Sequence, residues 1–315
     1  MNDIVTLGES MVVFDPSSTG PLRHVSEFKK HMAGAESNVA IGLARLGHRA
    51  GWLSRVGDDE FGRYITGTLK SEGIDVSRVI ADAGASTGVM FKERRNNRLM
   101  NVYYYRSNSA ASRLCSEDVD KEWIRASRML HVTGITPALS DSCHAAVCQA
   151  IRYAREAGVP VSFDLNLRLK LWDADKACET LLALIPECTY FLPGYSEGRL
   201  LTGIASIEDM ARYFHRMGPE AVVIKDGKKG AYLYDRDGGR WIEACRVEEV
   251  ADPIGAGDAF AAGFLSGVLK GQSHAEAVML GNVLGSYAVT IKGDWEGLPD
   301  LTELECLYPV EDTVR

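Results

Sequence analysis

The amino-acid sequence predicts an α/β fold: a mainly parallel sheet with helices on both faces, and a small inserted β subdomain. Short β-like runs alternate with longer helical runs along most of the chain, which is the pattern of parallel βαβ units. Two regions, at about residues 11–31 and 86–106, break this alternation because they are rich in strand-forming residues and turn signals. We expect them to form a β subdomain inserted in one domain that covers residues 1–315.

Short apolar runs and helical spacing justify the elements of the core in order. Strands are expected at residues 4–7, 50–56, 129–132, 159–164, 190–192, 221–225 and 231–234. Helices are expected at residues 37–46, from Asp58-Asp59 to near Gly73, from Ser140-Asp141 to Gly158, and at residues 257–269 and 274–291. Asp58-Asp59 can cap the second helix, and Gly47 can adopt the left-handed conformation that ends the first.

The inserted region contains a predicted hairpin. Its strands lie at residues 88–91 and 99–105, and the polar run Arg94-Arg95-Asn96-Asn97-Arg98 forms the turn between them. Strand alternation places Tyr104 and Arg106 on the same face.

Composition excludes several classes of protein. Of 315 residues, 46% are hydrophobic and 25% are charged, as expected for a soluble globular protein. No apolar run approaches the ~18 residues of a transmembrane helix, and the N-terminus lacks the pattern of a signal peptide, so we expect a cytoplasmic protein. A net charge of −8 argues against a nucleic-acid surface. Seven cysteines without a Cys-x-x-Cys pair are typical of reduced thiols.

The most informative stretch runs from Asp252 to Phe264, where Gly255-Ala256-Gly257 opens a helix of small residues. Free amides at a helix start bind anions, and glycines let an anion approach the backbone closely. Asp258 lies just inside, where it could accept a proton from a hydroxyl that attacks phosphorus. The alternative is an acidic residue that only complements the helix dipole.

The two common nucleotide fingerprints are missing. Gly-x-x-x-x-Gly-Lys-Ser/Thr does not occur in the sequence, which excludes a P-loop enzyme. Phe260 stands at the third glycine position of a dinucleotide fingerprint, which disfavours hydride transfer.

A second stretch of small residues, 33–47, precedes and forms a predicted helix. Gly34 would let a polyol approach the backbone, and Asn38 offers both a donor and an acceptor. Simple helix packing through Gly and Ala is the alternative explanation.

Together the two stretches resemble the signatures of the ribokinase-like (PfkB) carbohydrate kinase family, as do Gly8-Glu9 and residues 55–62. The resemblance implies a three-layer α/β/α sandwich with a mainly parallel central sheet and a small β-sheet lid. It also implies ATP and Mg²⁺ as cofactors. Asp258 would be the catalytic base, and the amides of Gly255, Ala256 and Gly257 the anion hole. The resemblance assigns Asp252 to a monovalent cation, such as the K⁺ bound in some members.

The resemblance also assigns nucleotide-side residues. Glu197 matches an acid that helps organise Mg²⁺, although Gly194 stands where many members have Asn. Lys225 and Gly227 match contacts to the nucleotide. Asn282 matches a position near the adenine, with an exposed polar helix residue as the alternative.

Two arginines indicate an acidic sugar. Asn166 and Arg168 follow a core strand, at the sheet edge where α/β proteins bind ligands. Arg106 ends the predicted lid hairpin. Two guanidinium groups converging on a neutral sugar would be expensive to desolvate, whereas a substrate carboxylate would pair with them. The alternative is a pair of surface arginines with buried stems.

Within that family, the chain resembles the 2-keto-3-deoxygluconate kinases. The resemblance lies in residues 34–38, 104–106, 131–140, 164–172 and 252–258. This resemblance implies transfer of the ATP γ-phosphate to the 6-hydroxyl of a six-carbon 2-keto acid. It places Gly34, Tyr104, Arg106, Arg168 and Asp258 at the substrate. Met90 stands where a close relative would carry a lid Tyr, so a variant acid or an epimer stays open.

Two other functions remain as alternatives. One is a fructokinase or another sugar or nucleoside kinase, and the other is a catalytically silent sugar or nucleotide sensor. Because lids in this family often pair between subunits, the resemblance also implies a homo-oligomer, whose only other partners are the sugar acid and ATP.

Overall fold

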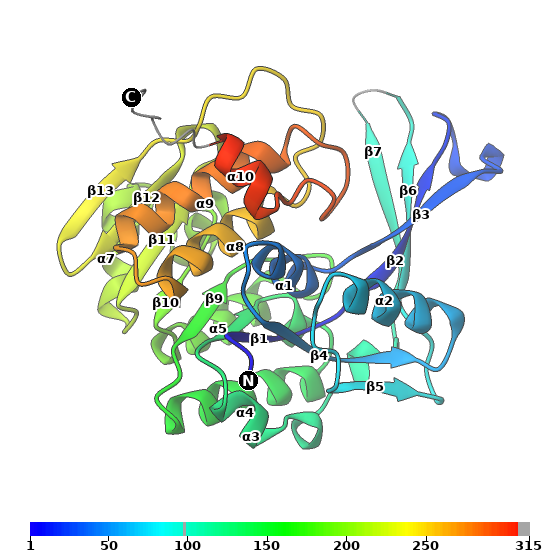
Figure 1. The fold of residues 1–315 in the computed structure, drawn as a ribbon, viewed down its shortest axis with the longest axis horizontal. Helices are drawn as coiled ribbons and strands as arrows, with labels where there is room; N and C mark the ends of the chain where they lie inside the picture. The colour runs from blue at the N-terminus through cyan, green and yellow to red at the C-terminus, as the bar shows by residue number, and fades with distance from the viewer. Residues whose placement is uncertain (97–98, 308–315) are drawn as a thin grey trace, which may run out of the picture.

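The chain forms two β-sheets (Figure 1). The computed structural model describes residues 1–96 and 99–307. The main sheet has nine strands in the order β13-β12-β11-β10-β9-β8-β1-β4-β5. Their bounds are β1 (Ile4–Leu7), β4 (Ala50–Gly57), β5 (Val79–Asp82), β8 (Leu130–Thr133), β9 (Val161–Asp164), β10 (Tyr190–Phe191), β11 (Ala221–Lys225), β12 (Ala231–Asp235) and β13 (Gly238–Ile242). Strands from β5 to β11 pair in parallel, whereas β12 and β13 are antiparallel to their neighbours.

Helices cover both faces of this sheet (Figure 1). They are α1 (Ala35–Arg45), α2 (Glu60–Ser71), α3 (Lys121–Arg125), α4 (Asp141–Glu156), α5 (Ala174–Leu184), α6 (Tyr195–Thr202), α7 (Ile207–Arg216), α8 (Ala256–Leu269), α9 (His274–Ala288) and α10 (Leu301–Leu307). Successive residues of β11 belong to two separate hydrophobic cores, one on each face of the sheet. Val223 lies in the core with α1, α8 and α9, and Val222 and Ile224 lie in the core with α4, α5 and α7. The predicted three-layer α/β/α sandwich is therefore confirmed.

The second sheet is small and has the order β3-β2-β6-β7. Its strands are β2 (Met11–Pro16), β3 (Phe28–Ala33), β6 (Val89–Arg94) and β7 (Met100–Tyr105). It stands beside the sandwich at the right of Figure 1. Phe14 stacks on Phe91 across this sheet with ring centroids 4.8 Å apart. We call this sheet the lid. Residues 97 and 98 of the predicted hairpin turn lie outside the described residues.

The local signals at the helix ends act as predicted. Asp59 caps α2 by accepting a hydrogen bond from the amide of Gly62 at 2.8 Å, and Ser140 caps α4 through the amide of Cys143 at 3.1 Å. Gly47 follows α1 with φ of +87°, the left-handed conformation that glycine adopts freely.

Several elements differ from the sequence prediction. The last long helix was expected to reach Ile291, but α9 ends at Ala288 because the carbonyl of Val289 accepts hydrogen bonds from the amides of Ala251 and Asp252. Strands β5 and β13 and helices α3, α5, α6, α7 and α10 were not predicted from the sequence. The connection between β11 and β12 is too short for a crossover helix, so these strands pair antiparallel. No helix in the described ranges is long and apolar enough to cross a membrane.

Helix α8 is buried in the sandwich and packs closely on α9. A Cβ added to Gly263 would lie 2.8 Å from the carbonyl oxygen of Leu280 and 2.9 Å from the Cα of Gly281. These neighbours are backbone atoms, so they cannot rotate away. Glycine is therefore required at this crossing.

We predict that Gly263→Ala lowers the free energy of unfolding by about 1–3 kcal/mol, the usual cost of overpacking. Gly67→Ala in α2 is the matched control, because a Cβ there meets nothing within 4 Å. That change should raise stability by about 0.4–1 kcal/mol. Urea unfolding measures both, and equal effects of the two substitutions would contradict the close-packing argument.

Candidate active site

The N-terminus of α8 lies near the carboxyl ends of β9 and β11. Gly255 is the residue before the first turn, with φ of +80°, a conformation that favours glycine. A Cβ on Gly255 would collide with the carbonyl oxygen of Asp294, so the backbone pairing of these two residues also requires glycine. Gly257 is exposed, and the nearest atom to a Cβ placed there is Nζ of Lys225 at 3.9 Å. The first backbone amides of α8 therefore lie close to the ammonium group of Lys225.

Asp258 lies in the first turn of α8 and is half-buried. Its Oδ2 accepts a hydrogen bond from Nδ2 of Asn38 in α1 at 2.7 Å. Burial raises the pKa of Asp258 to about 7, and the negative charge of Asp164 adds to that rise. The Asn38 hydrogen bond and the charges of Lys225 and Arg168 oppose the shift without reversing it. The carboxyl therefore titrates near neutrality, where a general base works best.

An ion pair lies beside this base. Nζ of Lys225, at the end of β11, is 2.6 Å from Oδ2 of Asp164, at the end of β9. Both side chains are largely buried, and Oδ1 of Asp164 has no hydrogen-bond partner within the described structure. Gly194 forms an isolated parallel bridge with Lys225. Lys225, predicted as a nucleotide contact, thus reaches the same centre as Gly257 and Asp258.

The loop after β9 carries Asn166 and Arg168. Asn166 has φ of +36°, which is uncommon for a residue with a side chain. Glu197 anchors this loop: its Oε1 accepts from the amide of Leu167 and its Oε2 from the amide of Gly194, both at 2.8 Å. The carboxylate of Glu197, which the resemblance assigned to Mg²⁺ organisation, therefore serves backbone amides of two loops.

The two predicted arginines differ in their partners. The guanidinium of Arg106 is ion-paired with buried Glu9, whose other oxygen accepts from the hydroxyl of Ser109 at 2.6 Å. Arg168 is exposed, and its side chain pairs with no carboxylate among residues 1–96 and 99–307. Its charge nevertheless acts on Asp258. We call the Arg168 guanidinium uncommitted, because it has no ion pair among the residues that the structure describes.

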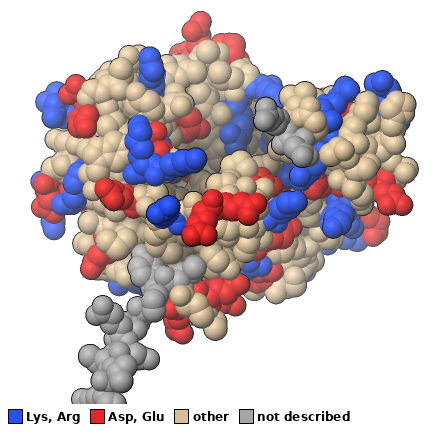
Figure 2. Space-filling view, turned by 90° about the horizontal axis from the view of Figure 1, so that it is seen from above, with Lys and Arg blue, Asp and Glu red and all other residues tan. Residues whose placement is uncertain are grey.

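Lid residues face this loop. The ring of half-exposed Tyr104 lies 5.8 Å from the guanidinium carbon of Arg106 and 5.8 Å from Nζ of Lys170. The lid strand β7 and the loop after β9 are thus close together at Tyr104, as the predicted sugar site requires. In Figure 2, Lys and Arg side chains gather around a hollow between the body and the lid on the right.

Gly34 has a packing role. It precedes α1 in an extended conformation, and a Cβ there would lie 2.5 Å from the carbonyl oxygen of Glu9 and 2.6 Å from Oγ of Ser10. Ser10 donates to Ser37 at 2.6 Å, and Ser37 donates to the carbonyl of Gly34 at 2.9 Å. Close packing of α1 on the start of the lid therefore already explains this glycine, and a contact to sugar stays a prediction.

Asn282 lies on α9 and is buried, so the alternative of an exposed polar residue is wrong. Its amide group donates to the carbonyls of Ile242 and Glu243 at 2.9 and 3.0 Å. These bonds tie α9 to the end of β13. The predicted contact between Asn282 and adenine stays a prediction.

The remaining predicted residues lie in loops. Gly227 follows β11 with φ of +52° and open space around it. Asp252 is buried, and its Oδ1 accepts from the amide of Ile254 at 3.1 Å. No group of three His, Cys, Asp or Glu side chains in the described part of the chain could hold a metal ion.

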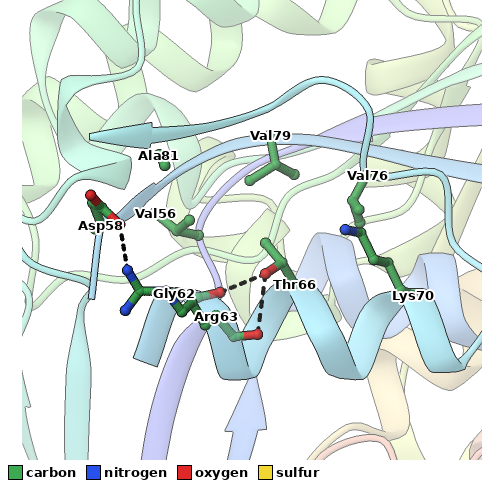
Figure 3. A pocket seen from close by; sticks show the side chains of 10 residues that line it. Val56, Asp58, Gly62, Arg63, Thr66, Lys70, Val76, Val79 and Ala81 are labelled. Carbon is green, nitrogen blue, oxygen red and sulfur yellow. Dashed lines mark hydrogen bonds and ion pairs between the residues drawn. The ribbon is translucent and has the colours of Figure 1, made fainter. Parts of the chain in front are cut away.

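A second hollow, of about 150 Å³, lies between α2 and strands β4 and β5 (Figure 3). Arg63 lines this hollow, and its guanidinium group is paired with Asp58 at 2.8 Å. The hydroxyl of Thr66 donates a hydrogen bond to the carbonyl of Gly62. The hollow contains none of the predicted site residues.

Two acidic residues that shape the site, Asp164 and Glu9, were not predicted as site residues from the sequence. Asp164 is the last residue of β9, and Glu9 lies just after the carboxyl end of β1. The position argument that selected Asn166 applies equally to Asp164, because both lie at the edge where parallel strands end. Glu9 carries the same signal after β1.

The fold and the site define a phosphotransferase: an α/β/α sandwich with a β lid, a helix N-terminus that can hold phosphate, and a carboxyl that titrates near neutrality. A family model described as "pfkB family carbohydrate kinase" matches residues 1–301. The chain belongs to this family, and the protein is a carbohydrate kinase.

Individual relatives agree. The chain is 43% identical over 99% of its length to 2-dehydro-3-deoxygluconokinase from Bacillus subtilis, covering 97% of that protein. It is 37% identical to the protein of the same name from Thermoproteus tenax, over 97% of this chain and 94% of that one. An Escherichia coli crystal structure described as a ribokinase II in complex with ATP and Mg²⁺ has a TM-score of 0.91 and 26% identity. That match covers 98% of this chain and 99% of the other. That structure therefore shows ATP and Mg²⁺ bound to a protein of similar fold.

We predict that the pKa of Asp258 is about 7 in the unliganded protein. Asn38→Ala should raise this pKa, because it removes a hydrogen bond to the charged form. Asp164→Asn should lower it, because it removes a nearby negative charge and frees Lys225. NMR titration of ¹³C-labelled aspartate carboxyls measures each value. A titration of Asp258 near the ordinary aspartate value of about 4 would contradict the electrostatic description.

Proposed function

We propose that the protein phosphorylates the 6-hydroxyl of 2-dehydro-3-deoxygluconate (2-keto-3-deoxygluconate) with ATP, by in-line transfer. The observation that carries this proposal is the uncommitted guanidinium of Arg168 close enough to affect the pKa of Asp258. A free cation beside a candidate base suits a substrate with both a hydroxyl and a carboxylate. The names of the two relatives support the same substrate.

Proton transfer is the task of Asp258. Its carboxylate accepts the proton of the sugar hydroxyl as the oxygen attacks phosphorus. Asn38 holds Oδ2 through the 2.7 Å hydrogen bond, which leaves Oδ1 for the hydroxyl. A pKa of about 7 keeps the group basic enough to take the proton and partly ionised at neutral pH.

Charge stabilisation is the task of the α8 N-terminus. The amides of Gly255, Ala256 and Gly257 form the anion hole for the transferring phosphoryl group. Lys225, at 3.9 Å from the Cβ position of Gly257, adds a positive charge there. The unpartnered Oδ1 of Asp164 and this ammonium are suited to a nucleotide phosphate with its Mg²⁺. Mg²⁺ bound to ATP offsets phosphate charge.

The sugar carboxylate is the partner that we propose for Arg168, through paired hydrogen bonds. Glu9 holds Arg106 in place at the base of the lid, and Tyr104 covers the polyol. Met90 packs with Met11, Val13 and Ala33 inside the lid. Its thioether supplies no strong hydrogen bond to the sugar, so the gluconate and galactonate epimers are compared directly in the assay below.

Lid pairing in a homo-oligomer is supported by β7, an edge strand on which Tyr103, Tyr104 and Tyr105 are exposed. The monovalent cation at Asp252, the nucleotide contacts of Gly194 and Gly227, and the cytoplasmic location stay predictions. A silent sensor is disfavoured because Asp258 and its flanking glycines are in place.

We predict that Asp258→Asn lowers kcat by about 10²–10⁴-fold, the usual contribution of a general base. The amide keeps the shape of the side chain, so calorimetry should show nearly unchanged substrate binding. In the wild type, kcat/KM should rise with pH through about 7, because the base must lose its proton. A loss below about 10-fold would remove Asp258 from this role.

The substrate itself is tested by ADP release with 2-dehydro-3-deoxygluconate, its galactonate epimer, fructose, ribose and adenosine. We predict activity on the keto acids. Arg168→Ala should raise the KM for the keto acid about 10–100-fold, since a hydrogen-bonded charge contributes about 1.5–3 kcal/mol. Arg199→Ala, on the exposed side of α6, is the control and should change nothing. Preference for a neutral sugar would overturn the substrate and leave the kinase class intact.

A further inference from the structure

A buried charged cluster joins the lid to the loop between α9 and α10. Oδ2 of Asp294 is 2.9 Å from Nζ of Lys92 and 3.2 Å from Nε2 of His31. Lys92 belongs to β6 and His31 to β3, so two lid strands converge on one carboxylate. The side chains of Lys92 and Asp294 are 3% and 7% exposed. In Figure 1 the orange-red segment beside α10 reaches toward these strands.

The charges of this cluster are strongly coupled. Burial alone would raise the pKa of Asp294, but the hydrogen bonds and charges of His31 and Lys92 outweigh it and lower that pKa. Asp294 is therefore a carboxylate held by Lys92 and His31 of the lid. Loss of these partners would be costly, because it would leave a buried carboxylate without an opposite charge.

The backbone of the same residue supports the anion hole. Gly255 packs directly on the carbonyl oxygen of Asp294, so closely that no side chain fits between them. The turn is held from its other side by Glu296, whose Oε2 accepts from the amides of Asp294 and Trp295 at 3.0 and 3.2 Å. Asp294 is therefore in backbone contact with the residue that precedes the first turn of α8.

A second connection runs along β3. This strand ends at Ala33 and leads through Gly34 into α1, where Asn38 donates to Asp258. His31 lies two residues before the strand ends. The lid strand that holds the Asp294 carboxylate is thus continuous with the helix that orients the catalytic base.

We propose that Asp294 is a positioning residue for phosphoryl transfer, whose side chain is held by Lys92 and His31 of the lid while its backbone carbonyl places Gly255 in the anion hole. The lid is then part of the catalytic geometry as well as a cover over the sugar. The proposal rests on the kinase function described above and does not depend on which sugar is the acceptor.

A purely structural role for this cluster would lead to different kinetic effects in the variants. If the cluster only fastened the lid, its removal would lower thermal stability and raise the KM for the sugar, with kcat unchanged. If the cluster positions Gly255, its removal lowers kcat, because small misplacements of catalytic groups cost up to about 100-fold in rate. The KM for ATP should stay within about twofold, because the rest of the nucleotide site is untouched.

The test uses Lys92→Met, Asp294→Asn and the double variant in the full-length protein. The double variant removes both charges and leaves no lone buried ion, so it should fold even if Lys92→Met does not. Lys29→Met is the matched control: Lys29 is an exposed lysine on the same lid strand as His31. Steady-state kinetics give kcat and both KM values, and thermal unfolding gives Tm.

We expect the double variant to lose about 10–100-fold in kcat while the control keeps wild-type kinetics. A double variant with wild-type kcat would overturn the proposal, whatever its Tm. The acceptor is the sugar that the wild type phosphorylates best. If that sugar is not the keto acid, the substrate proposal fails in the wild-type assay, and the comparison of the variants is still made.

Discussion

Close packing of α8 against its neighbours is the constraint on which the site depends. A Cβ on Gly42 of α1 would lie 2.7 Å from the Cβ of Ala262, and Gly263 and Gly281 bring α8 and α9 into backbone contact. These helices leave no room for sliding, so the first turn of α8 has one position at the sheet edge. Core packing therefore places Asp258 and the first turn of α8 at this edge, and Asp294 adds a backbone contact at Gly255.

The burial that locates Asp258 also sets its chemistry. A carboxyl taken out of water holds its proton more tightly, and Asp164 adds repulsion. Lys225 limits this effect because it is paired with Asp164 at 2.6 Å and also faces Gly257. One lysine therefore balances the acid pair and adds to the positive potential at the helix N-terminus.

The lid is joined to the body by buried charge at both ends. Arg106 and Glu9 form one tie, and Lys92, His31 and Asp294 form the other. Buried ion pairs are geometrically demanding, because a small displacement loses the attraction while the desolvation cost remains. Such ties hold the lid in one position against the body.

The sequence by itself determined the fold class, most strands of the main sheet, five of the helices and the catalytic candidates, because periodicity, capping residues and the Gly-Ala-Gly-Asp run act locally. The predicted cap at Asp59 and the left-handed Gly47 follow from single residues. Only the tertiary structure decided which partner each long polar side chain takes. Arg106 pairs with Glu9, whereas Arg168 has no ion pair among the described residues. The amide of Asn282 donates to two backbone carbonyls. These choices join residues far apart in the chain, and the distances that decide them exist only after the sheet, helices and lid have packed.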